Sequence, residues 1–401
     1  MAKRLAFKKP GRPRQNQVDI PFLLLTVLLS VIGLVMLLSA SYPTAIYDLK
    51  NVSGGDAMFY FRKQAIYAVL GFAIMYLVSR LNYQGLRGLA VLVLIFAFLL
   101  MLAVKVPGLG VTSGGATRWL KYPIQWQPSE LGKFGLILYF ASRLSRRDER
   151  TPLHFNDRNF FGRIGNRLED IGFFELIPYG LIIVIMVGLL YLEPHMSATI
   201  QMVVIAAAIL FAAGIGVGWF IAGGAAVGGA LLIIATQTTY MASRLAMWQD
   251  PWSDPLGKGM QAIQSLIAIG SGGLLGLGLG NSRQKFLYLP EAQNDCIFAI
   301  VCEELGLVGA TLVLLLFALL IIRGYWLAMH TRDRFGAYII VGIVTLFAFQ
   351  VFANVAVVTN LFPVTGISLP LFSSGGSALI IQLAEMGLVL GISRQNPVNK
   401  T

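Results

Sequence analysis

The sequence predicts an all-α fold, a polytopic membrane bundle of about ten transmembrane helices. Hydrophobic residues make up 56% of the 401 residues and charged residues only 12%, with a mean hydropathy of +0.72. Soluble domains carry roughly 25% charged residues, so a chain of this length lacks the polar surface that folding in water requires. The composition therefore excludes an ordinary soluble enzyme, a disordered chain and a nucleic-acid-binding domain, and it predicts several membrane spans.

Ten apolar segments are long enough, or nearly so, to cross a membrane as helices. The fourth and fifth segments are short, and only a Gly-Ile-Gly turn at 214–216 separates the sixth from the seventh. No small-residue cleavage site ends the first segment, so we expect a retained helix rather than a signal peptide. The segments are 20–41, 64–79, 85–104, 128–142, 177–192, 197–214, 217–236, 297–322, 336–359 and 376–393.

The distribution of basic residues predicts the orientation. With the N-terminus inside, the inner segments hold 20 of the 31 basic residues and the outer segments hold 10. Because cytoplasmic loops carry an excess of Lys and Arg, both termini should be cytoplasmic. These loops also account for the net charge of +12, so we expect no nucleic-acid partner. The inner segments are 1–19, 80–88, 143–176, 323–335 and 394–401.

The longest outer segment, 237–296, lies between the seventh and eighth helices and is too long for a simple connector. Within it, residues 258–269 have an amphipathic helical pattern that suits the outer membrane surface. Six glycines follow between 270 and 280, which indicates tightly turned backbone rather than a dinucleotide-binding loop. We expect one membrane domain between two cytoplasmic tails. These parts are 20–394, 1–19 and 395–401.

Ionisable residues in or beside a span are costly and are the first candidates for a site. Glu130 and Lys133 lie three residues apart at the start of the fourth helix, so they share one face and can pair. From spacing alone, a structural ion pair and a functional pair are equally good interpretations. At the next outer turn, Glu193 and His195 flank Pro194. A helix end with a solvated histidine is the simpler interpretation there.

Asp295 stands at the expected outer start of the eighth helix. It could be an N-cap, and the helix dipole would keep it ionised, as a general base requires. Glu303 and Glu304 lie deeper in the same apolar run, where we expect structural networks. The uncharged outer segment 360–375, rich in Pro, Gly and hydroxyl groups, predicts either broken backbone that lines a cavity or a tight packing loop. Zinc-ligand spacing and nucleotide motifs are absent, so no protein-held metal is expected, and a donor substrate should be lipid-borne.

Several strings, in order over about residues 20–394, resemble the SEDS family of shape, elongation, division and sporulation proteins, which includes FtsW, RodA and SpoVE. The variants at 293–294 and 302–304 are more typical of FtsW or SpoVE than of RodA. The matching strings are Phe59–Gln64, Arg118–Trp119, Gln127–Lys133, Leu289–Asp295, Ile297–Ala299, Glu303–Gly306, Pro363–Pro370 and Ser373–Ser377.

The resemblance implies a peptidoglycan glycosyltransferase of the bacterial cytoplasmic membrane. It implies that the enzyme polymerises lipid II at the outer face, releases undecaprenyl diphosphate, and acts with a class B penicillin-binding protein in division, sporulation or elongation. The family aspartate aligns with Asp295, which implies the general base. A divalent cation, Mg²⁺ or Mn²⁺, is a candidate cofactor because the leaving diphosphate needs positive charge. The residues expected to bind substrate are Arg118, Glu130, Lys133, Glu193, Arg244, Ser374 and Ser377.

Three departures from the family pattern and two competing functions stand beside this interpretation. Gln293-Asn294 replaces a frequent His-Thr, Cys296 replaces a frequent Phe, and Glu193-Pro194-His195 replaces a frequent Gln-Pro-Asp. Ten helices with buried charges also describe a lipid II flippase, which would place its key charges near mid-membrane, where Glu303, Glu304 and Glu385 are the nearest candidates. A scaffold that only recruits a partner is a third possibility. Asp295 and the 60-residue outer segment favour surface chemistry.

Overall fold

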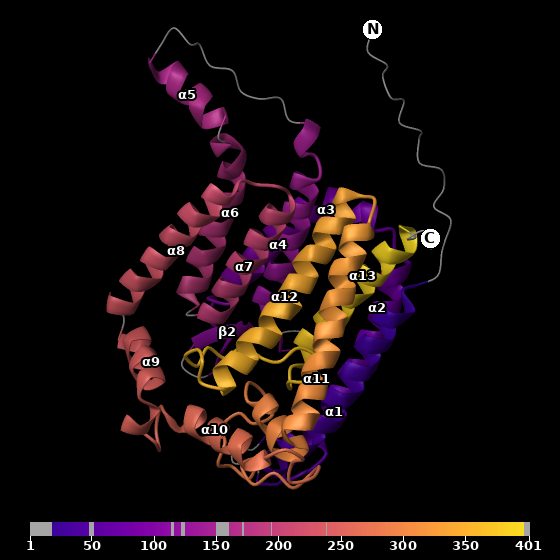
Figure 1. Ribbon diagram of the computed structural model, residues 1–401, viewed down its shortest axis with the longest axis vertical. Coiled ribbons are helices and arrows are strands. Elements are labelled where there is room, and N and C mark those ends of the chain that lie inside the picture. The colour runs from indigo at the N-terminus through magenta and orange to yellow at the C-terminus, as the bar shows by residue number, and fades with distance from the viewer. Residues whose placement is uncertain are drawn as a thin grey trace.

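The computed structural model describes residues 18–47, 52–113, 116–121, 125–149, 160–170, 172–193, 195–237 and 239–396, and the described chain is almost entirely helical (Figure 1). One antiparallel hairpin interrupts it. The helices are α1 (Ile20–Tyr47), α2 (Phe59–Arg80), α3 (Leu86–Ala103), α4 (Pro128–Leu144), α5 (Phe160–Asp170), α6 (Phe173–Leu192), α7 (Met196–Ala212), α8 (Val217–Gln237), α9 (Thr239–Gln249), α10 (Met260–Gly272), α11 (Ile297–His330), α12 (Arg334–Val358) and α13 (Gly376–Gln395). The strands are β1 (Gly110–Ser113) and β2 (Ala116–Leu120).

Seven of the described helices are long and apolar enough to cross a membrane. They are α1, α2, α3 with the short turn before it (Tyr83–Ala103), α6, α11, α12 and α13. Shorter apolar helices add to them, namely α7 and the first part of α8 (Val217–Ala226). Each of the ten predicted segments coincides with one helix. Nine of them are the helices just named, and the remaining one, the fourth segment, is the more polar α4. The predicted all-α polytopic membrane fold is therefore confirmed.

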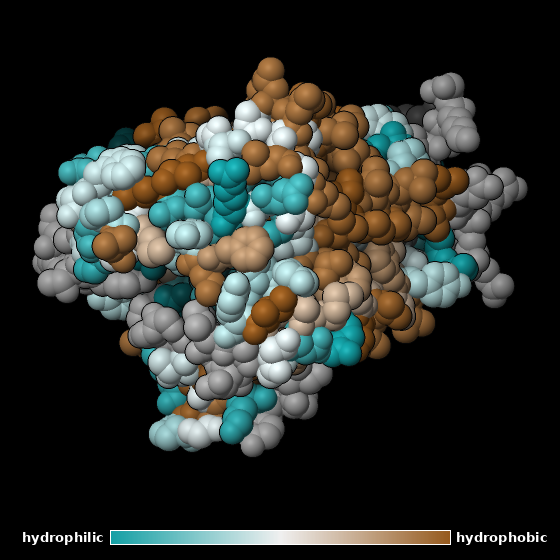
Figure 2. Space-filling model, turned by 90° about the horizontal axis from the view of Figure 1, so that it is seen from below, coloured by the Kyte–Doolittle hydropathy of each residue, from teal (hydrophilic) through white to brown (hydrophobic). Residues whose placement is uncertain are grey.

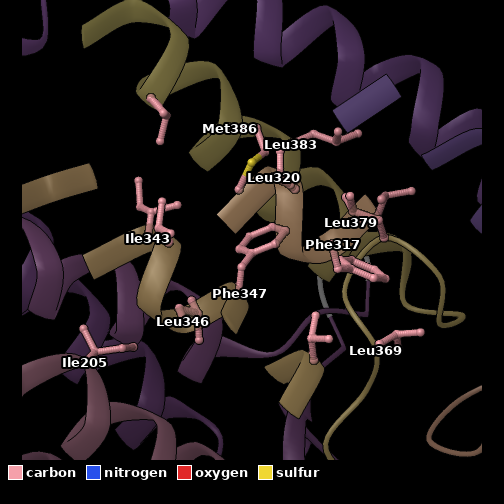
Figure 3. Packing of buried hydrophobic residues seen from close by; sticks show 14 of the residues in the cluster. Ile205, Phe317, Leu320, Ile343, Leu346, Phe347, Leu369, Leu379, Leu383 and Met386 are labelled. Atoms are coloured by element: carbon pink, nitrogen blue, oxygen red, sulfur yellow. The ribbon is translucent and has the colours of Figure 1, made fainter. Parts of the chain in front are cut away.

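The centre of the bundle is formed by α12 and α13, and one face of α11 packs against them (Figure 3). Phe317 and Phe347 are almost fully buried there, and the ring of Phe317 lies 5.5 Å from that of Phe372. In the apolar stretch of α12, 72% of the residues are buried, whereas only 22% are buried in the corresponding stretches of α2, α3 and α6. Contiguous exposed apolar surface indicates contact with lipid, so α12 is an inner helix and the other three are peripheral.

The described parts of the predicted inner segments lie together at one end of the bundle, the end that carries α5 in Figure 1. Arg323 Nη2 lies 2.6 Å from Asp19 Oδ2, which joins the first and fourth of these segments. Arg334 Nη1 lies 2.7 Å from Asp148 Oδ2, which joins the third and fourth. The predicted grouping of these segments is therefore confirmed. Most of the two predicted tails lies outside the described residues.

The outer segment 237–296 contains more structure than its sequence pattern predicts. The amphipathic stretch forms α10 as expected, and α9 precedes it. Neither α9, α5 nor the β1–β2 hairpin was predicted, because hydropathy marks spans and not short surface elements. Viewed from the end that carries α10, the molecule shows polar side chains beside a large hydrophobic flank (Figure 2). The polar surface is that of a protein end exposed to water next to a membrane.

The eighth predicted segment is not one continuous helix. Gly306, with φ 68° and ψ −172°, breaks α11. The carbonyl groups of Glu303 and Glu304 accept hydrogen bonds from the backbone N–H groups of Leu277 and Gly278, each at 3.0 Å. The N–H groups of Leu307 and Val308 donate to residues 273 and 274 at 2.9 and 3.1 Å. The glycine-rich stretch therefore supplies the partners that the broken helix lacks, which a low-polarity environment requires.

Glu303 and Glu304 take part in the structural network that we expected. Glu303 accepts from Ser282 Oγ at 2.5 Å and from the Arg283 N–H at 2.8 Å. Glu304 lies 2.8 Å from Lys285 Nζ, and both side chains are almost fully buried. The part of α11 after the break, from Leu307 to His330, is about 36 Å long, and the hydrocarbon core is about 30 Å thick. This part alone is long enough to cross the core, so the two acids before Gly306 lie away from mid-membrane.

Candidate functional site

Asp295 lies in the loop that leads into α11 and is held there by its backbone. Asn354 Nδ2 on α12 donates to the Asp295 carbonyl at 2.8 Å and to the Ile367 carbonyl at 2.7 Å. One buried amide thus joins the Asp295 loop to the outer segment 360–375. Ser373 strengthens the same junction, because its hydroxyl donates to the Asn294 carbonyl at 2.8 Å.

The Asp295 carboxylate is half-buried and accepts no hydrogen bond from a described residue. The expectation that it caps α11 is wrong, because Cys296 occupies the N-cap and no side chain makes a capping hydrogen bond. Gly366, at φ +75°, lies against the carboxylate, and a Cβ there would come within 3.2 Å of Asp295 Oδ2. The absence of a side chain at 366 leaves room beside Asp295 for another group.

Two of the predicted basic residues act on this carboxylate. Burial and the nearby Glu291 raise the pKa of Asp295 to about 6, while Arg244 and Arg118 oppose that rise. Arg244 Nη1 donates to the Val364 carbonyl at 2.5 Å, in the same outer segment as Gly366. At neutral pH the carboxylate is mostly ionised and still basic enough to take a proton, as a general base requires.

A second polar group lies at the α6–α7 turn. The structure corrects the expectation of a solvated histidine, because His195 is buried, and burial together with Arg118 and Lys133 lowers its pKa to about 3. Gln127 Nε2 lies 3.2 Å from His195 Nε2. Glu193 is buried with no hydrogen-bond partner for its carboxylate in the described chain, and burial raises its pKa to about 7 against Lys105 and Arg118. Arg118 thus acts on Asp295, Glu193 and His195 together.

The predicted Glu130–Lys133 pair forms, at 2.8 Å, with Lys133 almost fully buried. Lys133 Nζ also donates to Gln201 Oε1 on α7 at 2.8 Å. Glu385 of α13 has a buried carboxylate without a hydrogen-bond partner in the described chain, and the charges that act on it are those of Lys133 and Glu130. We did not predict Gln201 as part of this cluster, although a lone amide in an apolar helix was an available signal.

The two predicted serines, Ser374 and Ser377, lie at the same end of the bundle as Asp295. Their hydroxyl groups form no hydrogen bond with a described residue. The Ser374 N–H donates to the Gln293 carbonyl at 2.9 Å, so its role here is through the backbone. Ser377 is half-buried in the first turn of α13. Within the described ranges, no three His, Cys, Asp or Glu side chains converge as metal ligands.

Comparison with known proteins finds relatives over nearly the whole chain. The family model for FtsW, RodA and SpoVE, described as a cell cycle protein, matches residues 20–397. A "Probable peptidoglycan glycosyltransferase FtsW" of Geobacter sulfurreducens is 36% identical over 379 residues, 94% of this chain and 95% of the relative. The stage V sporulation protein E of Bacillus subtilis is 36% identical over 382 residues, 95% and 98% of the two chains. The first name agrees with the enzyme class expected from the sequence.

Two solved structures share the fold. A chain from a study of how a peptidoglycan synthase complex coordinates polymerization and crosslinking has a TM-score of 0.71 and 29% identity, with 95% of this chain and 98% of that chain covered. The rod shape determining protein RodA of Thermus thermophilus has a TM-score of 0.65 and 26% identity, with the same coverage. Since the family model matches nearly the whole chain and relatives above 30% identity cover it, the chain belongs to the SEDS family, the family of FtsW, RodA and SpoVE.

Proposed function

We propose that this chain is a glycosyltransferase that polymerises lipid II into glycan strands, with Asp295 as the general base. The observation that carries the proposal is the position of Asp295. Its half-buried carboxylate lies at the outer end of the bundle, is acted on by Arg118 and Arg244, and has open space beside it at Gly366. The named enzyme class of the FtsW relatives supports it.

The chemistry that we propose is one displacement with inversion. Asp295 removes the proton from the acceptor sugar hydroxyl, whose oxygen then bonds to the anomeric carbon of the donor. The bond from that carbon to the diphosphate oxygen breaks, and undecaprenyl diphosphate leaves with the bonding electrons. In this proposal Arg118 and Arg244 supply the positive charge that stabilises the leaving diphosphate. In this proposal Lys133, Glu130, Glu193, Ser374 and Ser377 bind substrate around this centre.

A divalent cation stays a prediction, and no step above depends on it. Because no cluster of three potential ligands occurs in the described residues, the protein would contribute few ligands, and Asp295 is the candidate carboxylate. The remaining ligands would be diphosphate oxygens and water, as is usual for Mg²⁺. Polymerisation in the presence of a chelator, with Mg²⁺ or Mn²⁺ restored, tests this requirement.

We also propose the orientation and the partner. The end of the bundle that carries α5 faces the cytoplasm, as the charge bias predicts, and Asp295 faces outward. A class B penicillin-binding protein with one membrane span crosslinks the strands. The similarity to a chain from a peptidoglycan synthase complex supports that partnership.

The decisive experiment is polymerisation of labelled lipid II by the purified full-length protein. Asp295→Asn should lower turnover by about 10²–10⁴-fold while the protein stays folded, because Asp295 does not cap α11. Asp295→Glu should also be poor, since proton transfer needs hydrogen-bond reach. Asp250→Asn removes an exposed carboxylate in the outer segment and serves as the matched control. Near wild-type polymerisation by Asp295→Asn would exclude the assignment.

A lipid II flippase is the alternative, and one observation favours it. Glu385 is a buried, unpartnered carboxylate within a spanning helix, near the charge of Lys133. Such groups mark transport pathways in membrane proteins. Translocation without polymer formation by the purified protein in vesicles would support the flippase, and polymer formation in detergent would support the enzyme.

A further inference from the structure

An arginine-lined cavity of about 520 Å³ lies at the end of the bundle opposite Asp295. It lies between α3, α4 and α6, and its volume is within the range of small-ligand sites. Two of its lining residues are acidic and four are basic. The acidic residues are Glu149 and Glu175, and the basic residues are Arg87, Arg143, Arg146 and Arg147.

Two of the four arginines are already engaged by the protein. Arg147 Nε lies 2.6 Å from Glu175 Oε1, and its Nη1 donates to the Ala213 carbonyl at 2.9 Å. Arg87 Nη2 donates to Ser145 Oγ at 3.1 Å and lies 3.6 Å from Asp333 Oδ1. These two side chains form a fixed wall of the cavity, and Glu175 and Asp333 compensate much of their charge.

The other two arginines are available. Arg143 and Arg146 are exposed and form no ion pair or side-chain hydrogen bond with a described residue. Guanidinium groups bind phosphate oxygens in a bidentate manner, which makes arginine the preferred residue at such sites. The excess of positive charge in the cavity therefore comes from Arg143 and Arg146, whose guanidinium groups lie at its edge and pair with no described residue.

An apolar track runs from this cavity along the membrane-facing surface. On α3 it passes Val91, which lines the cavity, and Ile95 one turn further along the same face, 50% and 48% exposed. On α6 it passes Pro178, another lining residue, and Leu181, 58% exposed. Both helices start at the cavity and cross the membrane from there. A ligand with a phosphate group and acyl chains would place each part against surface of matching polarity.

We propose that this cavity binds the headgroup of an anionic phospholipid, of the phosphatidylglycerol class, from the leaflet at this end of the bundle. Basic cavities between transmembrane helices bind such headgroups in other membrane proteins. Arg143 and Arg146 contact the phosphate, the ion-paired Arg87 and Arg147 form the fixed wall of the cavity, and the acyl chains lie along α3 and α6. A free phosphate ion shares the headgroup chemistry but would not use the apolar track.

The test uses full-length protein in nanodiscs of equal parts phosphatidylglycerol and phosphatidylcholine. After extraction into detergent, native mass spectrometry counts the retained phosphatidylglycerol. Arg143→Gln with Arg146→Gln should weaken retention by about 30-fold, the effect expected for two basic side chains at an anionic headgroup. Arg163→Gln with Arg167→Gln on α5 removes the same charge from exposed positions outside the cavity and is the matched control.

Three results decide the proposal. Retention by the wild type and by the α5 variant, with loss in the Arg143/Arg146 variant, supports it. Equal retention by all three proteins overturns it, because the lipid would then bind elsewhere. Displacement of the retained lipid by millimolar inorganic phosphate also overturns the lipid assignment and indicates a site for free phosphate. The readout is independent of polymerisation, so it does not depend on the function proposed above.

Discussion

Replacement of Lys133 by methionine tests how much the polar cluster of Lys133, Glu130 and Gln201 stabilises the protein. Lys133 Nζ is bonded to Glu130 and to Gln201, both at 2.8 Å, and its side chain is 2% exposed. Lys133→Met keeps most of the side-chain volume and removes the charge. Glu130, whose side chain is 13% exposed, then loses the Lys133 donor, and the side-chain carbonyl of Gln201 keeps only the longer hydrogen bond from Gln350 Nε2 at 3.4 Å.

Removal of one partner from a buried ion pair destabilises a protein by about 3–5 kcal/mol, because the remaining charge is left unpaired. For a chain of this length the unfolding entropy implies a loss of about 4–6 °C in Tm. The assay is thermal unfolding of the purified protein in detergent. Lys258→Met, at an exposed position of the outer segment, is the control and should leave Tm unchanged.

The double variant Glu130→Gln with Lys133→Met separates structure from function. If Glu130 is the acid that Lys133 balances, Tm should return to near the wild-type value. Incomplete recovery would identify Glu385, which also experiences the Lys133 charge, as the second acid. Polymerisation should stay low in the double variant if Lys133 also meets the diphosphate. A Tm of Lys133→Met within about 1 °C of wild type would refute the reasoning.

Four further outcomes are expected. Because the pKa of Asp295 is about 6 and the base form is required, polymerisation should fall about tenfold per pH unit below 6, and a flat profile from pH 5 to 7 would contradict this role. Burial raises the pKa of Glu193 to about 7, so the folded state binds this proton more tightly than the unfolded chain does. The free energy of unfolding should therefore decrease between about pH 4.5 and 7, and Glu193→Gln should flatten that dependence in unfolding measurements. Gly366→Ala should reduce polymerisation and lower stability by roughly 1 kcal/mol, because it strains a positive φ and fills the space beside Asp295; full activity would show that this space is not used. Cysteine at Ser253 should react with an impermeant thiol reagent in intact cells and cysteine at Arg163 should not, and the reverse pattern would invert the orientation.

The spans could be predicted because the length of an apolar run is a local property of the chain. The break at Gly306 could not be predicted, because a single glycine is common in an apolar helix. Whether the helix breaks there depends on residues 273–278, about 30 residues earlier in the chain, which bond to both sides of the break. The amphipathic pattern of α10 was visible for the same reason as the spans. The β1–β2 hairpin has no hydropathy signal.

The candidate site shows the same division. Asp295, Arg118 and Arg244 could be proposed from motif and charge, and the structure places them within electrostatic reach of one another. His195 was predicted to be solvated because its local sequence is a turn, yet Gln127, 68 residues earlier in the chain, lies against its ring and it is buried. The N-cap expectation for Asp295 failed because α11 begins with Cys296 as its N-cap.

The backbone junction at Gly306 affects how deletion experiments on this protein should be designed. Four hydrogen bonds connect residues 273–278 to the two sides of the break in α11, and Asp295 immediately precedes that helix. Shortening the outer segment to a flexible linker would leave those four bonds unmade and expose the break. Loss of activity in such a deletion would therefore report damage to the helix that follows Asp295, and it would say nothing about docking of a partner. Substitutions at exposed side chains, such as Leu256 at 86% exposure, leave the junction intact and are the informative alternative.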